Sequence, residues 1–273
     1  MKIIKIESLD NPDLYPYRTL RRAIEHIKKR IFVAEGEKVV RRLLESNLSI
    51  ESFLLTEDWY EVLKNFITNR CNSDIPVYIG TKKMLESIVG FNLHQGIMAV
   101  GKIPEPIALD ELIDDNCSSH FFVAVDGLTN SDNLGVIVRN CVAFNVDALI
   151  VGETSSSPYL RRAIRQSMGA VFELKIFESD NLYEDIRKIS QVYDFEIIAA
   201  DPHGEKIISE KIGYRKNICI VFGSEGFGIR EDIIAICNER VNIPISQKID
   251  SLNVASASAI FLYEINKLRT NCY

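Results

Sequence analysis

The sequence predicts an α/β protein whose second half is built on a mostly parallel sheet, and three observations support this class. Unbroken apolar runs, such as residues 120–127 and 217–223, are typical of strands that are covered on both faces. Stretches with apolar residues at helical spacing lie between these runs. Pro104 and Pro106 interrupt both patterns and divide the 273 residues into two parts of ordinary domain size.

The part before the prolines, residues 1–105, is predicted to be a small α/β domain. Its apolar spacing alternates between the helical and the extended period. We expect helices at 18–31, 34–46, 58–68 and 81–89, and strands at 49–55, 75–80 and 96–101.

The part after the prolines, residues 106–273, shows the cleaner alternation of strands and helices. We expect strands at 120–127, 147–152, 172–177, 195–200, 217–223 and 240–245, and helices at 132–144, about 158–168, 181–192, 230–237 and about 251–269. Ligands of open α/β sheets bind beyond the carboxyl ends of the strands. The loops that follow strands 120–127, 217–223 and 240–245 are therefore the places to search for a site.

Composition and charge exclude several classes of protein. The formal net charge is −6, which argues against a protein that coats nucleic acid nonspecifically. The N-terminus has no signal-peptide pattern, and no apolar run is long enough to cross a bilayer. The six cysteines and four histidines show no metal-ligand spacing, so we expect reduced thiols, a cytoplasmic protein and no metal site.

A local basic patch stands out against the acidic total. It comprises Arg18, Arg21, Arg22, Lys28, Lys29, Arg30, Lys38, Arg41 and Arg42, opposed by Glu25, Glu35 and Glu37. Such a cluster could contact the phosphates of a nucleic acid. On charge alone, a solvated helix face is an equally good interpretation.

The first candidate loop is DGLTNSDNLGVIVRN, residues 126–140. Asp132 or Asn133 could cap the following helix, and Gly135 leaves room beside its first turn. Arg139 follows Asn133 by six residues within an otherwise apolar stretch. Taken alone, Arg139 is typical of an exposed or salt-bridged helix position.

The second and third loops carry glycines and small residues. Gly223, Gly226 and Gly228 follow a strand in GSEGFG, where a backbone could approach a ligand closely, although many such turns are merely tight. This spacing matches neither the dinucleotide fingerprint nor the P-loop. After Pro244, Ser251 could cap a last helix whose small residues, 255–259, allow close packing.

Together, these motifs resemble those of the SpoU family of RNA ribose 2′-O-methyltransferases. The first motif is matched by Asn133, Gly135 and Arg139, and the second by the stretch from Gly223 to Gly228. The third is matched by Ile243-Pro244 and by Ser251 to Val254, while 167–170 resembles the family's SMGA turn. The resemblance covers roughly residues 118–270. It departs from the family at Ala255, where many members have serine.

The resemblance implies a C-terminal α/β-knot domain at 106–273, with a deep trefoil knot that brings the second and third loops together. It implies S-adenosylmethionine as the cofactor, held by the backbone of Gly223, Ile243 and Leu252, with Ser224, Gly226 and Pro244 beside them. The catalytic residues it implies are Arg139, Asn133, Asn253, Ser251 and Glu225. It also implies a homodimer packed partly through the last helix, with Arg139 serving either its own or the partner's cofactor, and no metal.

The first half resembles the RNA-binding extension of the same family, which has an L7Ae-like fold. The resemblance lies in residues 32–40 and 94–99. It implies RNA contacts at Arg21, Arg22, Lys29, Arg30, Glu35, Lys38 and Gln95. The substrate implied is rRNA, most readily 23S rRNA. A tRNA substrate and a non-catalytic RNA-binding or ribosome-assembly protein are the alternatives.

Overall fold

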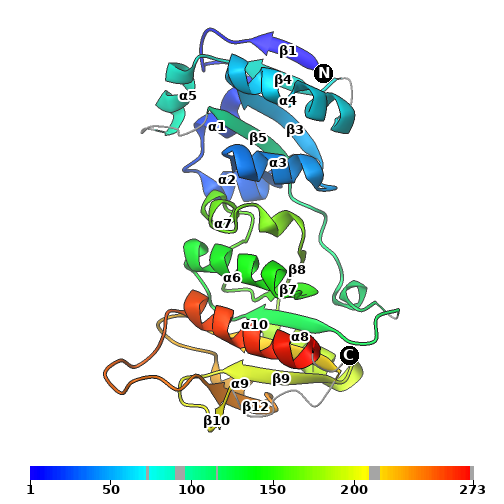
Figure 1. Cartoon of the computed structure of the whole chain (residues 1–273), viewed down its shortest axis with the longest axis vertical. Helices are drawn as coiled ribbons and strands as arrows, with labels where there is room; N and C mark the ends of the chain where they lie inside the picture. Colours follow the sequence, from blue (N-terminus) through cyan, green and yellow to red (C-terminus); the bar gives the residue numbers. More distant parts are fainter. Residues whose placement is uncertain (72–73, 90–95, 115, 209–215, 271–273) are drawn as a thin grey trace. The chain divides into compact units, whose positions relative to one another are not determined.

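The computed structural model describes residues 1–71, 74–89, 96–114, 116–208 and 216–270. The chain forms two compact units (Figure 1). Unit 1 comprises Met1–Glu105 and Tyr159–Phe172, and unit 2 comprises Pro106–Pro158 and Glu173–Tyr273. The sequence interpretation divided the chain once, near residue 105. The structure instead packs a short segment of the second half with the first.

Unit 1 is built on a five-stranded mixed sheet with the order β1-β4-β3-β5-β2. Its strands are β1 (Lys2–Lys5), β2 (Ile31–Glu35), β3 (Ile50–Leu55), β4 (Pro76–Ile79) and β5 (Ile97–Lys102). Its helices are α1 (Tyr15–Arg18), α2 (Ala23–Lys28), α3 (Glu37–Glu45), α4 (Glu57–Arg70), α5 (Lys82–Val89) and α7 (Arg161–Gln166). β1, β3 and β4 run parallel, whereas β5 is antiparallel to both β3 and β2.

The predicted helix at 18–31 is wrong at both ends, because α1 ends at Arg18 and α2 covers only Ala23–Lys28. Arg30 has a positive φ of 51°, which breaks the helical run, and Ile31–Glu35 then forms a strand paired with β5. β-Branched and aromatic residues suit a strand whose first four positions are buried. The predicted helix at 34–46 therefore begins only at Glu37, and β1 was not predicted at all.

Unit 2 is built on a seven-stranded parallel sheet with the order β10-β12-β9-β11-β6-β7-β8. Its strands are β6 (Phe121–Val125), β7 (Ala148–Val151), β8 (Lys175–Glu178), β9 (Phe195–Ala200), β10 (Lys206–Ile207), β11 (Asn217–Phe222) and β12 (Glu239–Asn242). Its helices are α6 (Ser131–Ala143), α8 (Leu182–Val192), α9 (Glu231–Ile234) and α10 (Val254–Thr270). Every strand predicted here is present, and the two-residue β10 is an addition.

The sheet of unit 2 is covered on both faces, as the apolar runs predict. Phe122, Phe195 and Cys219 pack with Ile186 of α8 and Ile233 of α9 on one face. Successive residues of a strand point to opposite faces, so Phe222 lies on the other face, where its ring contacts Phe261 of α10 at 5.8 Å.

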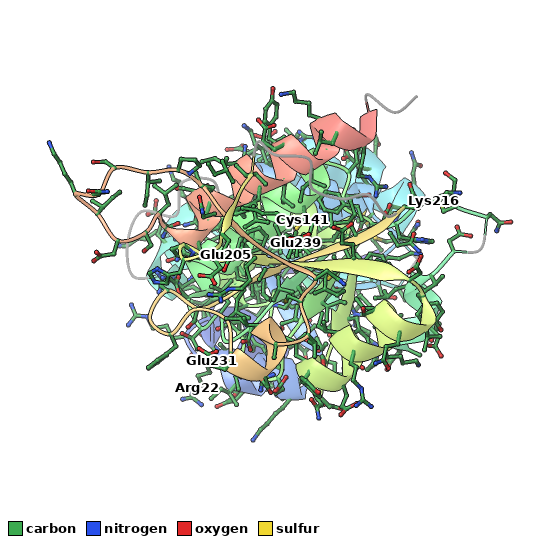
Figure 2. The ribbon with its side chains drawn as sticks, turned by 90° about the horizontal axis from the view of Figure 1, so that it is seen from below. Arg22, Cys141, Glu205, Lys216, Glu231 and Glu239 are labelled. Atoms are coloured by element: carbon green, nitrogen blue, oxygen red, sulfur yellow. The ribbon has the colours of Figure 1, made fainter. Side chains whose placement is uncertain are left out.

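α6 packs against α10 on this second face. Cys141 on α6 is fully buried there (Figure 2). Asn140 of α6 donates hydrogen bonds from Nδ2 to the Ala255 carbonyl at 3.1 Å and to Ser258 Oγ at 2.9 Å. The small residues of α10 thus permit the close helix contact that the sequence suggested.

Three further sequence expectations concern membranes, thiols and metals. Among the described residues, no helix combines the length and the apolar character needed to span a bilayer. The five cysteines that fall within the described ranges are free thiols, and Cys272 lies outside them. No group of three potential ligands that could hold a metal ion is found in the part of the chain that the structure describes.

Candidate functional site

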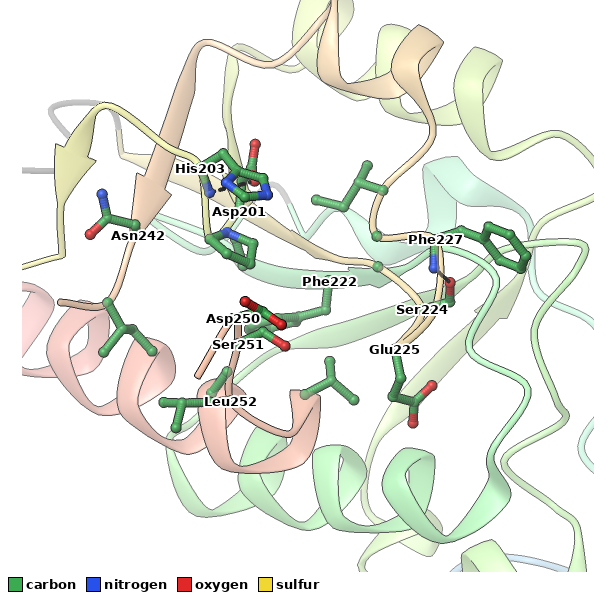
Figure 3. Close-up of a pocket in the computed structure, with 18 of the residues that line it drawn as sticks. Asp201, His203, Phe222, Ser224, Glu225, Phe227, Asn242, Asp250, Ser251 and Leu252 are labelled. Carbon is green, nitrogen blue, oxygen red and sulfur yellow. Dashed lines mark hydrogen bonds between the residues drawn. The ribbon is translucent and has the colours of Figure 1, made fainter. Parts of the chain in front are cut away.

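A cavity of about 620 Å³ opens at the carboxyl ends of three neighbouring strands of unit 2 (Figure 3). The loop after β9, the glycine-rich loop after β11 and the loop between β12 and α10 form its walls. This volume lies in the range of small-ligand pockets. The cavity occupies the place that parallel α/β sheets give to ligands, and two of the three loops are those singled out from the sequence.

The glycine-rich loop is folded on itself beside the cavity. Ser224 and Gly228 exchange two backbone hydrogen bonds of 3.0 Å each, and Ser224 Oγ accepts the amide of Phe227 at 3.1 Å. A Cβ atom on Gly223 would lie 2.1 Å from the carbonyl carbon of Gly228, so only glycine fits there. Gly226, by contrast, has no neighbouring atom within 4 Å of such a Cβ position.

Three polar side chains from distant parts of the chain form a hydrogen-bonded string next to this loop. Asn253 donates from Nδ2 to Asn133 Oδ1 at 3.2 Å, and Asn133 in turn donates to Glu225 Oε1. In Figure 3 the Glu225 side chain leaves the loop on a different side from that of Phe227. The three sequence motifs therefore meet at a single point, one residue from each.

The helix caps differ from the sequence expectation and explain how the string is positioned. The N-cap of α6 is Asn130, whose Oδ1 accepts the amides of Asp132 and Asn133, so the Asn133 side chain remains available. At α10 the Ala255 amide donates to Asn253 Oδ1 at 2.9 Å, so Asn253 takes the role expected of Ser251. Ser251 instead lines the cavity.

An ion pair between the buried Asp126 and the partly exposed Arg230 holds the exit of the glycine-rich loop. The Asp126 side chain at the end of β6 is 2% exposed, accepts the Arg230 amide at 2.8 Å and lies 3.3 Å from Arg230 Nε. Arg230 also donates to Glu153 Oε1 at 2.8 Å. Burial raises the pKa of Asp126, whereas for Glu153 the Leu182 amide and the charge of Arg230 outweigh burial and lower the pKa.

Arg230→Ala is expected to destabilise the fold by about 3 kcal/mol at pH 8, because it strands a buried carboxylate. A carboxyl whose folded pKa is raised loses stability as the pH rises through that pKa, and removal of Arg230 raises the pKa of Asp126 further. The loss should therefore be smaller at pH 5 than at pH 8, because protonation of Asp126 becomes easier as the pH falls. Urea unfolding at both pH values measures it.

Arg187→Ala is the matched control, since this exposed arginine of α8 forms its ion pair along its own helix, with Glu184 at 3.1 Å. It should change the free energy of unfolding by less than about 1 kcal/mol at either pH. Equal losses at pH 5 and pH 8 in Arg230→Ala would contradict the assigned role of Asp126.

The proposed catalytic and cofactor residues do not all reach the cavity of their own chain. Gly223, Ser224, Glu225 and Gly226 line it, as do Ile243, Leu252 and Asn253. Asn133 contacts Glu225 and Asn253 from outside the lining. Pro244 and Arg139 are not among the lining residues, and both are exposed.

Sequence reasoning missed the wall that follows β9. Asp201 and His203 line the cavity, and the backbone amide of His203 donates a hydrogen bond to Asp201 Oδ1 at 2.9 Å (Figure 3). Arg240 of β12 holds Asp201 through Nη2 at 2.6 Å. Position was the only available signal, since residues 201–203 follow the end of β9 just as the other two loops follow their strands.

The candidate RNA-binding residues lie in unit 1 and divide into two groups. Arg21, Arg22, Lys29 and Lys38 are exposed. Arg30 instead donates to the Pro104 carbonyl, and Glu35 pairs with Arg161 at 2.5 Å, so both have partners within the unit. Gln95 lies outside the described residues.

Comparison with known proteins gives matches along most of the chain. The family described as SpoU rRNA methylase matches residues 120–263, and that described as RNA 2′-O ribose methyltransferase substrate binding matches 33–107. An uncharacterised tRNA/rRNA methyltransferase of Mycobacterium tuberculosis is 29% identical over 263 residues, which are 93% of this chain and 88% of the relative. The 23S rRNA (guanosine-2′-O-)-methyltransferase RlmB of Acinetobacter baylyi is 28% identical over 199 residues, with 71% and 79% covered.

Solved structures agree on the fold. An AdoMet-bound rRNA methyltransferase from Sinorhizobium meliloti superposes with a TM-score of 0.85 at 22% identity, covering 97% of this chain and 98% of that one. The SpoU methyltransferase AviRb from Streptomyces viridochromogenes gives a TM-score of 0.80 at 19% identity, covering 95% and 98%. At these identities the likeness concerns the fold.

The parallel sheet, with a cavity between its strand-end loops, belongs to the α/β fold that these solved structures share. Since the first family match covers more than half of the chain, the protein belongs to the SpoU rRNA methylase family. The resemblance, the fold class and the enzyme class expected from the sequence are thereby confirmed.

Proposed function

We propose that the protein transfers a methyl group from S-adenosylmethionine to a ribose 2′-hydroxyl of RNA, with 23S rRNA as the substrate. The observation that carries this proposal is the string of Asn253, Asn133 and Glu225 beside the glycine-lined cavity. A protein that only binds RNA has no need of such an arrangement. The name of the RlmB relative supports the choice of rRNA.

The cavity fits the cofactor. Its lining combines apolar side chains such as Leu252 and Phe222 with glycine backbone at 223, 226 and 228. At Gly223 there is no room for a side chain, so the backbone groups of this loop would hold the adenosine together with those of Ile243 and Leu252. Bound there, S-adenosylmethionine supplies an electrophilic methyl group on a sulfonium.

The residues of this chain would act on the nucleophile. The nucleophile would be the ribose 2′-hydroxyl, which would lose its proton to water as its oxygen takes the methyl group from the sulfonium. Arg139 would stabilise the developing oxyanion or the adjacent phosphate, because a guanidinium keeps its proton throughout the accessible pH range. Asn133, Ser251, Asn253 and Glu225 would fix the geometry through hydrogen bonds.

We also propose that the protein acts as a homodimer, packed through α10 and the neighbouring face of α6. Ile260 and Tyr263 of α10 are 38% and 53% exposed, and Tyr263 contacts Phe144 just beyond α6. Arg139 is exposed on α6 and pairs with none of the described residues, which leaves it available to a second chain. In this arrangement Arg139 would serve the cavity of the partner.

The dimer is tested by replacing Ile260 and Tyr263 with glutamate. Charge on this face should shift the protein to a monomer in analytical ultracentrifugation and abolish methyl transfer, with the far-UV circular dichroism unchanged. Val192→Glu, which charges another exposed apolar residue (64% exposed) on α8, is the matched control. A monomeric wild-type protein with full activity would contradict the proposal.

The activity itself is tested with the purified protein, S-adenosylmethionine labelled in the methyl group, and separate 23S rRNA, 16S rRNA and tRNA transcripts. Nuclease digestion of labelled RNA should release 2′-O-methylated nucleosides, and 23S rRNA should be labelled fastest. Preferential labelling of tRNA would favour the tRNA-directed alternative. Cofactor binding without transfer to any RNA would favour a non-catalytic protein. An rRNA substrate would be met in the cytoplasm.

A further inference from the structure

The two units differ in charge far more than the total suggests. Unit 1 contains 19 of the 32 Lys and Arg residues and 14 of the 38 Asp and Glu residues, for a formal charge of +5. Unit 2 contains the other 13 Lys and Arg residues and the other 24 Asp and Glu residues, for a formal charge of −11. Glu205 and Glu231 are exposed acids of unit 2 (Figure 2). A polyanion is therefore attracted by unit 1 and repelled by most of unit 2.

Most of the positive excess of unit 1 comes from the segment Tyr159–Phe172, which follows β7 in the sequence. It carries Arg161, Arg162 and Arg165 and no acidic residue. The Phe32 ring of β2 stacks on Tyr159 at 5.9 Å and on Phe172 at 5.2 Å. The aromatic contacts hold both ends of this segment, so α7 is a fixed part of unit 1.

Two polar contacts fix the orientation of α7 relative to β2 and α3. Arg161 Nη2 lies 2.5 Å from Glu35 Oε2, and the two side chains are only 18% and 14% exposed. Arg42 of α3 donates from Nη1 to the Met168 carbonyl at 3.0 Å, at the end of the α7 turn. The ion pair also neutralises Glu35, so this carboxylate does not oppose an anion at the neighbouring surface.

These contacts place four cationic side chains on α3 and α7, two helices of unit 1 that both pack beside β2. Lys38 and Arg42 are exposed and one turn apart on α3, and Arg162 and Arg165 are exposed on α7. We name these four residues the α3–α7 basic surface. We propose that the α3–α7 basic surface binds the phosphodiester backbone of the RNA substrate, so that α7 extends the RNA-binding unit with residues from the catalytic half of the sequence.

This inference rests on the proposed function and adds to it. The substrate-binding match ends at residue 107, and α7 lies within the stretch matched by the methylase family, so neither match assigns α7 to RNA binding. Guanidinium groups pair with phosphate oxygens in a bidentate manner, which favours a nucleic acid backbone as the partner. The alternative is that this surface binds an acidic protein, in which case its loss would leave RNA binding unchanged.

The test is the double substitution Arg162→Ala and Arg165→Ala in the full chain. Binding of a 23S rRNA transcript is measured at several salt concentrations, together with cofactor affinity and thermal unfolding. Two lost phosphate contacts should reduce the slope of log affinity against log salt by about 1.4–1.8. Affinity near 0.1 M salt should fall at least about tenfold. Cofactor affinity and Tm should stay at wild-type values.

Lys82→Ala with Lys83→Ala is the matched control, since it removes the same charge from exposed positions on α5 of the same unit. Its salt slope should equal that of the wild-type protein. The inference is overturned if the α7 variant binds RNA like the wild type, or if both variants lose affinity equally. If the wild-type protein binds cofactor but neither binds nor methylates RNA, the proposed function fails as well. If the wild-type protein methylates RNA and the α7 variant binds RNA as tightly as the wild type does, only the inference is overturned and the proposed function stands.

Discussion

Gly223→Ala is expected to abolish cofactor binding and to destabilise unit 2 by about 3 kcal/mol or more. The new Cβ would lie 2.1 Å from the carbonyl carbon of Gly228 and 2.3 Å from the amide nitrogen of Ile229. Both neighbours are backbone atoms of the folded loop, so they cannot move aside as a flexible side chain would, and overpacking of this kind is costly. Isothermal titration with S-adenosylmethionine and thermal unfolding measure the two effects.

Gly226→Ala provides the control within the same loop. Its Cβ would meet nothing within 4 Å, and Gly226 is not among the residues with positive φ. We therefore expect a Tm within about 2 °C of the wild type. If Gly223→Ala retained cofactor affinity and stability, the account of the loop as a wall made of backbone would be wrong.

Arg139→Ala is expected to lower kcat for methyl transfer by about 10²–10³-fold while leaving cofactor affinity unchanged. This magnitude is typical for the loss of one group that stabilises a developing oxyanion. The side chain is exposed and does not line the cavity of its own chain, so its removal should not disturb the fold or the cofactor pocket. Single-turnover methyl transfer and titration with S-adenosylmethionine separate the two effects.

Two further variants sharpen this result. Arg187→Ala on α8 removes an exposed arginine elsewhere in unit 2 and should keep activity within about twofold of the wild type. Arg139→Lys keeps the positive charge but loses the planar fork, so it should recover only part of kcat. Full activity in Arg139→Ala would contradict the electrostatic role.

Much of unit 2 could be predicted from the sequence because its strands are buried on both faces. Such strands appear as unbroken apolar runs, and 120–127 and 217–223 contain β6 and β11. The capping residues were harder to predict. Asn130, Asp132 and Asn133 are all able to cap a helix, and only the folded backbone shows that Asn130 does so.

Unit 1 shows where local pattern was insufficient. The predicted helices at 18–31 and 34–46 overlap the two ends of β2, whose residues form a strand by pairing with β5. The β-branched and aromatic residues of this stretch suit a strand, but the pairing with β5 that decides the outcome comes from a distant part of the sequence. The packing of Tyr159–Phe172 on β2 is equally non-local, since Glu35 and Arg161 are 126 residues apart.

The candidate site was predicted as three motifs, and the structure adds how they meet. The string from Asn253 through Asn133 to Glu225 joins one residue of each motif. Spacing along the chain could not reveal the wall formed by Asp201 and His203, because its residues carry no motif. Nor could it reveal that Arg139 lies away from the cavity of its own chain.

The measurement that tests the central claim most directly is mass-spectrometric mapping of ribose methylation in RNA from cells with and without the gene. The account predicts that one 2′-O-methylated nucleotide of 23S rRNA is lost with the gene. The wild-type gene should restore it, and the Arg139→Ala gene should not. An unchanged pattern of ribose methylation in all RNA, or the loss of a base methylation instead, would contradict it.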